Sequence, residues 1–194
     1  TELKDLMSDE DYTFVTSYFQ DTLQMPIQYF TKWKPFLLST FPLLNSLDCT
    51  PISVEQLLQD FAATQSVPIS GLETVEEQMA VIDKLPYDKQ ASALVESLRE
   101  YQETVKMTSE MYSLYREQDV DGLYKLTEEY FDSEMAELES KLLAERNANW
   151  IPRIIEMTSE GSYFFGVGAA HLGGEKGILE LLRKADYEVF PVVN

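Results

Sequence analysis

Apolar residues near the start of the chain are spaced as in an amphipathic helix. Within residues 8–23 they recur every three or four positions, at Tyr12, Val15, Phe19 and Leu23. Ser8 and Asp11 together form a cap-like start for this helix. The aromatic stretch that follows is interrupted by Pro35 and Pro42. We expect short helices around an irregular corner there, because proline removes a helical hydrogen-bond donor.

The middle of the chain has the pattern of a helical region from about residue 74 to residue 160. Thr74 and Glu77 form a capping box at its start, since each side chain can bond to a backbone N–H of the other residue. Residues 88–117 contain no Gly or Pro and carry one apolar stripe, so we predict a single long helix. A separate helix is predicted over residues 53–65.

Three short apolar segments have the pattern of β-strands, at residues 67–70, 161–168 and 187–193. A glycine-rich loop and a short amphipathic helix lie between the last two segments, which indicates a C-terminal βαβ unit with parallel strands and a right-handed crossover. We therefore predict an α/β fold (α+β by residue count) that is predominantly helical, with a small mixed or parallel sheet. A sheet this small normally has further strands beside it.

Composition and charge narrow the classes of function. The chain has 194 residues and carries 34 Asp and Glu against 15 Lys and Arg. Its net charge of −19 argues against a nucleic-acid partner, because phosphate binding needs a basic face. Residues 95–145 are especially acidic, and we interpret them as a solvated helical surface without the spacing of a cation-binding loop. We expect no membrane span, because no apolar run approaches the length of about 18 residues that a span needs.

The chain has one cysteine and one histidine. Cys49 lies in a polar turn without a nearby base, so we interpret it as incidental, and a single cysteine excludes an internal disulfide. His171 is of more interest, because it follows a predicted buried strand and precedes a glycine-rich loop. Backbone N–H groups of that loop and of the next helix could bind an anion or a developing oxyanion.

Glu73 occupies a place that matches that of His171, just after the predicted strand at 67–70. If both strands run parallel in one sheet, the two side chains emerge at the same edge, where they could share a divalent metal or act as an acid/base pair. Simpler interpretations stay open for both residues. His171 could be a loop histidine bonded to the backbone, and Glu73 could be a carboxylate that stabilises a helix N-terminus.

A dinucleotide-binding loop is a weaker interpretation of the same region. Gly166 and Gly168 have the first two glycine positions of that motif, but His171 stands where the third glycine would allow close helix–strand contact. Only twenty residues follow Gly174, which leaves no room for the rest of a nucleotide-binding half. The histidine is therefore the more informative part of the motif.

Five sequence blocks, taken together, resemble the TraB/GumN family, which includes the TIKI-type metalloproteases. The last block, GVGAAHLGGEKGILELLRKADYEVFPV, closely resembles the terminal signature of the family. Upstream, in the family's order, lie KPFLLS, GLETVEEQ, MYSLYREQD and AERNANWIPRI. The resemblance covers nearly the whole chain, which we treat as one TraB/GumN-like domain over residues 1–194. It implies a metal-dependent hydrolase, plausibly a peptidase, with a fold related to erythromycin-esterase-like and ChaN-like proteins.

The resemblance also implies roles for particular residues. His171 would be a metal ligand or an acid/base group, Glu73 a ligand or general base, and Arg146 an electrostatic stabiliser of a carboxylate or oxyanion. The cofactor would be a divalent metal ion such as Mn, Zn or Co. Substrate or anion binding is expected at Asn147, Gly168, Gly173 and Gly174. The alternative function is a non-catalytic helical protein-binding module on the same scaffold.

The chain departs from the family pattern at two places. Gln118 stands where the family has a glycine before Asp119, a change that we expect to be mild. The chain also lacks the first Gly-x-x-His motif that family members carry near their start, and Glu73 with His171 gives only two of the three or more ligands that metal sites use. We therefore expect an N-terminally truncated family member with weak metal binding and impaired catalysis. The resemblance favours an exported, periplasmic or cell-envelope location over a cytoplasmic one.

Overall fold

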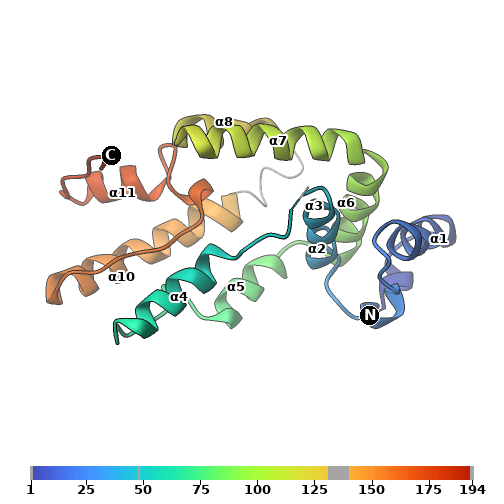
Figure 1. The fold of residues 1–194 in the computed structure, drawn as a ribbon, viewed down its shortest axis with the longest axis horizontal. Coiled ribbons are helices and arrows are strands. Elements are labelled where there is room, and N and C mark those ends of the chain that lie inside the picture. The colour runs from blue at the N-terminus through green and yellow to red at the C-terminus, as the bar shows by residue number, and fades with distance from the viewer. Residues whose placement is uncertain (1, 48, 131–139, 193–194) are drawn as a thin grey trace. The chain divides into compact units, whose positions relative to one another are not determined.

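The computed structural model describes residues 2–47, 49–130 and 140–192, which form two compact units. The first unit contains Thr1–Ser53 and Ile82–Glu110, and the second contains Val54–Val81 and Met111–Asn194. Both are built from helices, and the structure is 67% helical (Figure 1). None of the helices in the described ranges combines the length and apolarity that a membrane-spanning segment needs.

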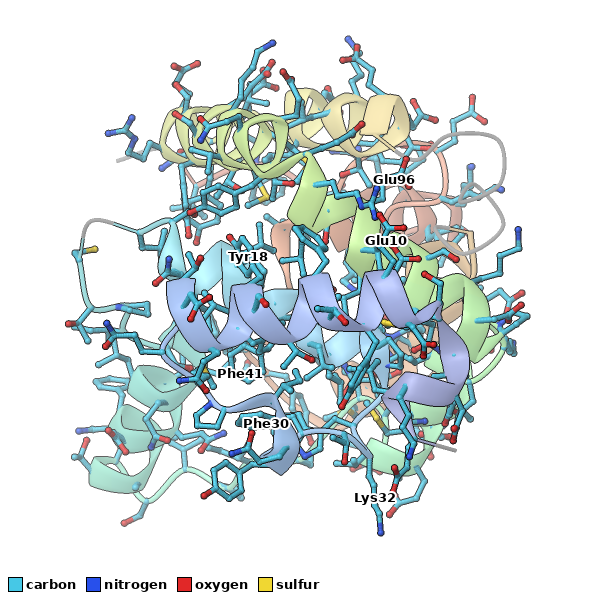
Figure 2. The ribbon with its side chains drawn as sticks, turned by 90° about the vertical axis from the view of Figure 1, so that its right-hand side faces the viewer. Glu10, Tyr18, Phe30, Lys32, Phe41 and Glu96 are labelled. Carbon is cyan, nitrogen blue, oxygen red and sulfur yellow. The ribbon has the colours of Figure 1, made fainter. Side chains whose placement is uncertain are left out.

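The first unit packs short helices around an aliphatic and aromatic core. Its elements are η1 (Leu3–Leu6), α1 (Asp9–Ser17), the π-helical turn η2 (Tyr18–Thr22), η3 (Ile27–Tyr29), α2 (Pro35–Leu38), α3 (Thr40–Asn45), α6 (Tyr87–Arg99) and the first part of α7 (Tyr101–Glu117). Figure 2 shows α1 in front, with Tyr18 on one side of it and Phe30 and Phe41 on the other. The ring centroids of Phe30 and Phe41 lie 5.5 Å apart. Phe19, which is fully buried, lies 6.0 Å from Phe41.

The cap predicted at Ser8 is confirmed. The Ser8 hydroxyl accepts a hydrogen bond of 3.1 Å from the backbone N–H of Asp11, which satisfies a donor in the first turn of α1. The two prolines also have the effect that the sequence predicted. Pro35 begins α2 and Pro42 lies in the first turn of α3, positions where the missing N–H is not needed for helical bonding.

The second unit holds the candidate site residues. Its elements are α4 (Val54–Thr64), α5 (Val75–Ile82), the last part of α7, α8 (Val120–Tyr130), η4 (Ser140–Glu145), α10 (Arg146–Glu160), η5 (Ala169–His171) and α11 (Ile178–Lys184). Trp150, Ile154 and Ile178 form its buried apolar cluster, so α10 and α11 are packed against each other. The helical region predicted from about 74 to 160 includes residues 131–139, which lie outside the described residues.

The predicted α/β fold is wrong. No residue that the structure describes belongs to a β-strand, and neither the small sheet nor the C-terminal βαβ unit forms. The segments at 67–70 and 161–168, and the described part of 187–193, are irregular in secondary structure and are not paired with one another. Their short apolar runs predicted strands from local pattern alone. A strand also needs a neighbour for its backbone hydrogen bonds, and apolar pattern alone does not supply one.

The single long helix predicted over residues 88–117 is also wrong. The chain forms α6 and α7, separated at Glu100, whose φ and ψ of −98° and 32° lie outside the helical region. Arg99, Glu100 and Tyr101 are ordinary helix residues, so their types carry no signal for this break.

Candidate functional site

Glu73 and Arg146 form an ion pair between two segments that are far apart in sequence. Arg146 is the first residue of α10, and Glu73 lies just before α5. Arg146 Nη2 donates to Glu73 Oε1 at 2.6 Å, and Nε lies 3.1 and 3.2 Å from the two carboxylate oxygens. Both side chains are largely buried, with 14% and 16% exposed for Arg146 and Glu73. This forked geometry holds the carboxylate in one orientation.

His171 is held by Asn147 from the next position of α10. Asn147 Nδ2 donates to the backbone oxygens of His171 and Lys176, at 3.2 and 2.9 Å. Its Oδ1 must then be the acceptor in the 2.6 Å contact with His171 Nδ1. The neutral imidazole therefore carries its proton on Nδ1. Its Nε2 keeps a lone pair, which lies 3.4 Å from Arg146 Nη1.

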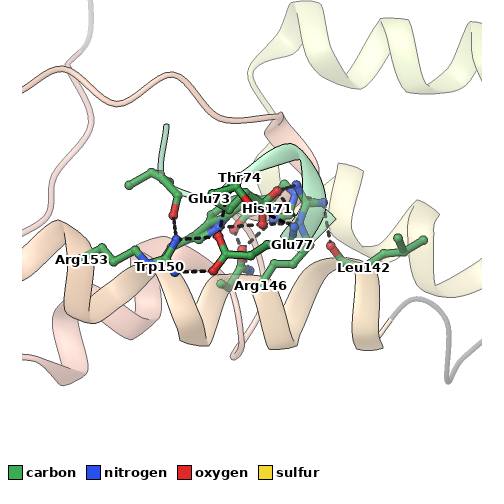
Figure 3. A network of polar contacts seen from close by, with 10 residues as sticks. Glu73, Thr74, Glu77, Leu142, Arg146, Trp150, Arg153 and His171 are labelled. Atoms are coloured by element: carbon green, nitrogen blue, oxygen red, sulfur yellow. Dashed lines mark hydrogen bonds and ion pairs between the residues drawn. The ribbon is translucent and has the colours of Figure 1, made fainter. Parts of the chain in front are cut away.

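Trp150 completes the cluster (Figure 3). It lies one turn after Arg146 on α10, and its Nε1–H donates to Glu73 Oε2 at 3.1 Å. The centroid of its rings lies 4.6 Å from that of the imidazole of His171, and the Arg146 guanidinium lies 4.9 Å from it. Trp150 thus contacts Glu73, Arg146 and His171, and it covers one face of the imidazole.

The environment of His171 disfavours its protonation. The side chain is only 7% exposed, and this burial lowers its pKa to about 4. The Arg146 guanidinium lowers the pKa as well, whereas the Glu73 carboxylate acts in the opposite direction. His171 is therefore neutral near pH 7 and can act there as a base or a ligand, but not as an acid.

Local sequence features fix Glu73 at this place. The predicted capping box is confirmed, since the Thr74 N–H donates to Glu77 at 2.8 Å and the Glu77 N–H donates to Thr74 at 3.1 Å. Arg153, two turns after Arg146, pairs with Glu77 at 2.7 Å and also donates to the carbonyl of Leu72. The chain on both sides of Glu73 is therefore attached to α10 or to the start of α5.

The two glycines after His171 let the loop approach α8 closely. A Cβ on Gly173 would lie 2.7 Å from the Val120 carbonyl oxygen, and one on Gly174 would lie 2.6 Å from the ring of Tyr124. Gly174 also has a φ of 75°, which favours glycine. These contacts explain both glycines by packing against α8. Anion binding at Asn147, Gly168, Gly173 and Gly174 stays a prediction.

The structure brings together Glu73, Arg146, Asn147 and His171, all singled out from the sequence. The arrangement differs from the expected one, because Glu73 and His171 lie against the first turn of α10 and not at the edge of a sheet. Gly168 lies at the start of η5, where its carbonyl accepts the His171 N–H at 2.9 Å. Sequence reasoning missed Trp150 and Arg153. Their spacing from Arg146, four and seven positions, places all three on one face of a helix and was the available signal.

The two candidate ligands are of types that bind divalent metals, but they are fewer than a metal site usually has. A carboxylate oxygen and an imidazole nitrogen with a lone pair are suitable ligands for Zn or Mn. Among the described residues, however, no group of three or more His, Cys, Asp and Glu side chains could hold an ion. The Arg146 guanidinium contacts both of these groups, so an ion that binds to them must displace the guanidinium from at least one of them.

Comparison with protein families identifies the class of this protein. A sequence model of the TraB/PrgY/gumN family matches residues 1–191. The chain therefore belongs to the TraB/PrgY/gumN family, and the resemblance in its sequence blocks is confirmed. No curated protein and no solved structure gave a significant match.

Proposed function

We propose that this chain is a metal-dependent hydrolase of the TraB type, with a peptide or protein as its substrate. The observation that carries the proposal is that two possible metal ligands, His171 Nε2 and the Glu73 carboxylate, both lie against the Arg146 guanidinium. The positively charged guanidinium already contacts both ligand groups, so the same pair suits a divalent cation such as Mn, Zn or Co. Family membership supports the proposal.

The residues of the site have separable tasks in this proposal. His171 Nε2 and Glu73 would hold the ion, which when bound polarises a carbonyl oxygen as a Lewis acid. Asn147 keeps the imidazole proton on Nδ1, so that the Nε2 lone pair is directed at the site. Arg146 supplies positive charge for a substrate carboxylate or a developing oxyanion, and Trp150 shields one face of the imidazole from water.

Calorimetric titration with Zn²⁺ tests the metal part of the proposal without an activity assay. We expect the wild-type chain to bind Zn²⁺ and His171→Ala to bind it at least tenfold more weakly. Arg146→Gln should bind it several-fold more tightly, because the competing guanidinium is removed. Cys49→Ser is the matched control, since Cys49 is exposed and a thiolate is a common zinc ligand. Equal affinities of wild type and His171→Ala would overturn the proposed site.

Peptide cleavage tests the hydrolase part. In the presence of Mn²⁺ or Zn²⁺, the wild-type chain should cleave members of a random peptide library at a low rate, because the site offers two ligands, and His171→Ala should lose this activity. Circular dichroism of both proteins shows whether the variant keeps its helices. Cleavage at the wild-type rate by a folded His171→Ala variant would contradict the assignment.

One observation favours the second candidate, a non-catalytic protein-binding module. The Arg146 guanidinium satisfies Glu73 and His171 at once, so the cluster is complete as a structural element without any ion. In that case Arg146→Gln would lower stability and would not increase zinc affinity. The same titration therefore separates the two candidates.

A further inference from the structure

Trp150 contacts both candidate metal ligands from a fixed position. Its indole N–H donates to Glu73 Oε2 at 3.1 Å, and the centroid of its rings lies 4.6 Å from that of the His171 imidazole (Figure 3). The side chain is buried in one apolar cluster with Ile154 and Ile178. Close packing of this kind keeps a side chain in one rotamer, so the indole N–H keeps one direction.

The two carboxylate oxygens of Glu73 differ in their hydrogen-bond donors. Oε1 accepts from Nη2 and Nε of Arg146, at 2.6 and 3.1 Å. Oε2 accepts from Arg146 Nε at 3.2 Å and also from the Trp150 N–H. In the part of the chain that the structure describes, Oε1 therefore depends on Arg146 for its hydrogen bonds, whereas Oε2 keeps a donor if Arg146 moves away.

Arg146 is the donor that a bound cation would displace. Its guanidinium is positively charged and repels a divalent ion at short range, whereas the indole N–H of Trp150 is neutral. Arg146 also has a second acceptor, since its Nη1 donates to the Leu142 carbonyl at 3.0 Å. Trp150 is buried, and leaving its N–H without an acceptor would be unfavourable. A cation that binds Glu73 should therefore displace Arg146 and leave the Trp150 hydrogen bond in place.

We propose that Trp150 is a positioning residue for the metal, which holds Glu73 Oε2 and leaves Oε1 as the single ligand oxygen. This role rests on the metal site proposed above, and it specifies which oxygen binds and which class of ion is preferred. One carboxylate oxygen and one imidazole nitrogen suit Zn²⁺, which is usually tetrahedral. Mn²⁺ favours six oxygen-rich ligands and gains more from a carboxylate that offers both oxygens. Trp150 thus favours Zn²⁺ over Mn²⁺.

Proton–nitrogen spectra of the full chain test the Trp150 hydrogen bond directly. The chain has two tryptophans and therefore two indole N–H signals, which the spectrum of Trp33→Phe assigns. Trp33 is 46% exposed and lies in the first unit, so it is the internal control. Added Zn²⁺ should shift the Trp150 signal and leave its N–H protected from exchange with water, while the Trp33 signal stays in place. Rapid exchange of the Trp150 N–H in zinc-bound protein would overturn the proposal, because the indole would then have released Glu73.

Two variants separate the indole N–H from its packing. Trp150→Phe keeps an aromatic ring but has no N–H, whereas Ile154→Val loosens the same apolar cluster and keeps the N–H. In calorimetric titrations, Trp150→Phe should bind Zn²⁺ about tenfold more weakly than the wild type. Its affinity for Mn²⁺ should fall less, so that the preference for Zn²⁺ over Mn²⁺ decreases. Ile154→Val should keep the wild-type preference.

The outcomes distinguish this role from the metal site itself. Equal zinc binding by wild type and His171→Ala would overturn the site and the role of Trp150 together. Zinc binding that requires His171 but is unchanged in Trp150→Phe would overturn the role of Trp150 alone. So would equal losses for both ions in Trp150→Phe and Ile154→Val, because Trp150 would then act through packing. The exchange measurement uses the wild-type chain, so it decides the question even if Trp150→Phe does not fold.

Discussion

At the scale of single residues, one asparagine determines the chemical state of the histidine. Asn147 uses its amide N–H groups on two backbone carbonyls and its oxygen on His171 Nδ1. All of these bonds suit a neutral imidazole with a lone pair on Nε2. A protonated imidazole would instead present an N–H to the Arg146 guanidinium, which is itself a donor. The contacts around His171 therefore stabilise its neutral form relative to its protonated form.

This arrangement predicts an acid-dependent loss of stability that is specific to His171. In metal-free protein its pKa is about 4, against an ordinary value of 6.5. Between these two values the unfolded chain binds a proton that the folded chain does not, so stability falls as the pH falls. The contribution is fully present above pH 6.5 and is lost as the pH falls towards 4. From the difference between the two pKa values it amounts to about 3 kcal/mol.

The measurement is urea unfolding at pH 7 and pH 4.5 for the wild type and for His171→Gln, which keeps a polar side chain without this titration. Carboxylates also titrate in this range, so the difference between the two proteins isolates the histidine. The chain has one histidine, so its imidazole proton resonances can be followed without assignment by mutation. A midpoint near 6.5 in the folded protein would contradict the prediction.

The same scale shows which site residues the sequence could reveal. Glu73, Arg146, Asn147 and His171 were available from motif resemblance, because each belongs to a conspicuous block. Trp150 lies in the same block as Arg146, but the resemblance gave it no role, and a tryptophan on an amphipathic helix is most often a core residue. Its role became visible only when its Nε1–H was seen on the Glu73 carboxylate and its rings beside His171.

At the scale of elements, predictions that depend on a few neighbouring residues were correct. The caps at Ser8 and Thr74 are both formed, because a cap needs only residues within one turn. The prediction of strands was wrong because a strand depends on residues far away in the sequence. Its apolar pattern is local, but its hydrogen bonds come from another strand, and the described residues provide none. The break at Glu100 lacks even a local signal.

The end of α7 gives a prediction at this scale. The N–H groups of Gln118 and Asp119 bond to the carbonyls of Tyr115 and Leu114, at 3.1 and 3.0 Å, which is a Schellman-type helix end. Gln118 has a φ of 59°, a conformation that favours glycine. This geometry explains the glycine that the family has before Asp119. We expect Gln118→Gly to stabilise the chain by about 0.5–1 kcal/mol, after the greater entropy of unfolded glycine is subtracted.

Urea unfolding of Gln118→Gly and Gln118→Ala tests this explanation. Alanine shortens the side chain but keeps the Cβ atom that is unfavourable at positive φ, so Gln118→Ala should give no comparable gain. If the two variants are equally stable, the strain at residue 118 does not account for the family's glycine.

At the scale of the whole molecule, the dominant property is negative charge. A net charge of −19 on 194 residues favours solubility but destabilises a folded chain through self-repulsion. Exposed ion pairs such as Arg153–Glu77 and Arg183–Glu180 oppose this effect only weakly, because water and salt screen them. The repulsion between like charges should therefore outweigh the attraction within surface pairs.

The consequence is that added salt should stabilise the protein. Raising NaCl from a few millimolar to about 0.5 M shortens the range over which charges repel to a few ångströms. If this adds about 1 kcal/mol to the free energy of unfolding, the melting temperature should rise by about 2–4 °C for a chain of this size. Melting curves in NaCl and KCl should agree, because screening depends on ionic strength and not on the cation, while sucrose at equal osmolality controls for changes in water activity. A melting temperature that falls with salt would mean that attractive pairs, among them Arg146–Glu73 in its largely buried site, contribute more than the repulsion does.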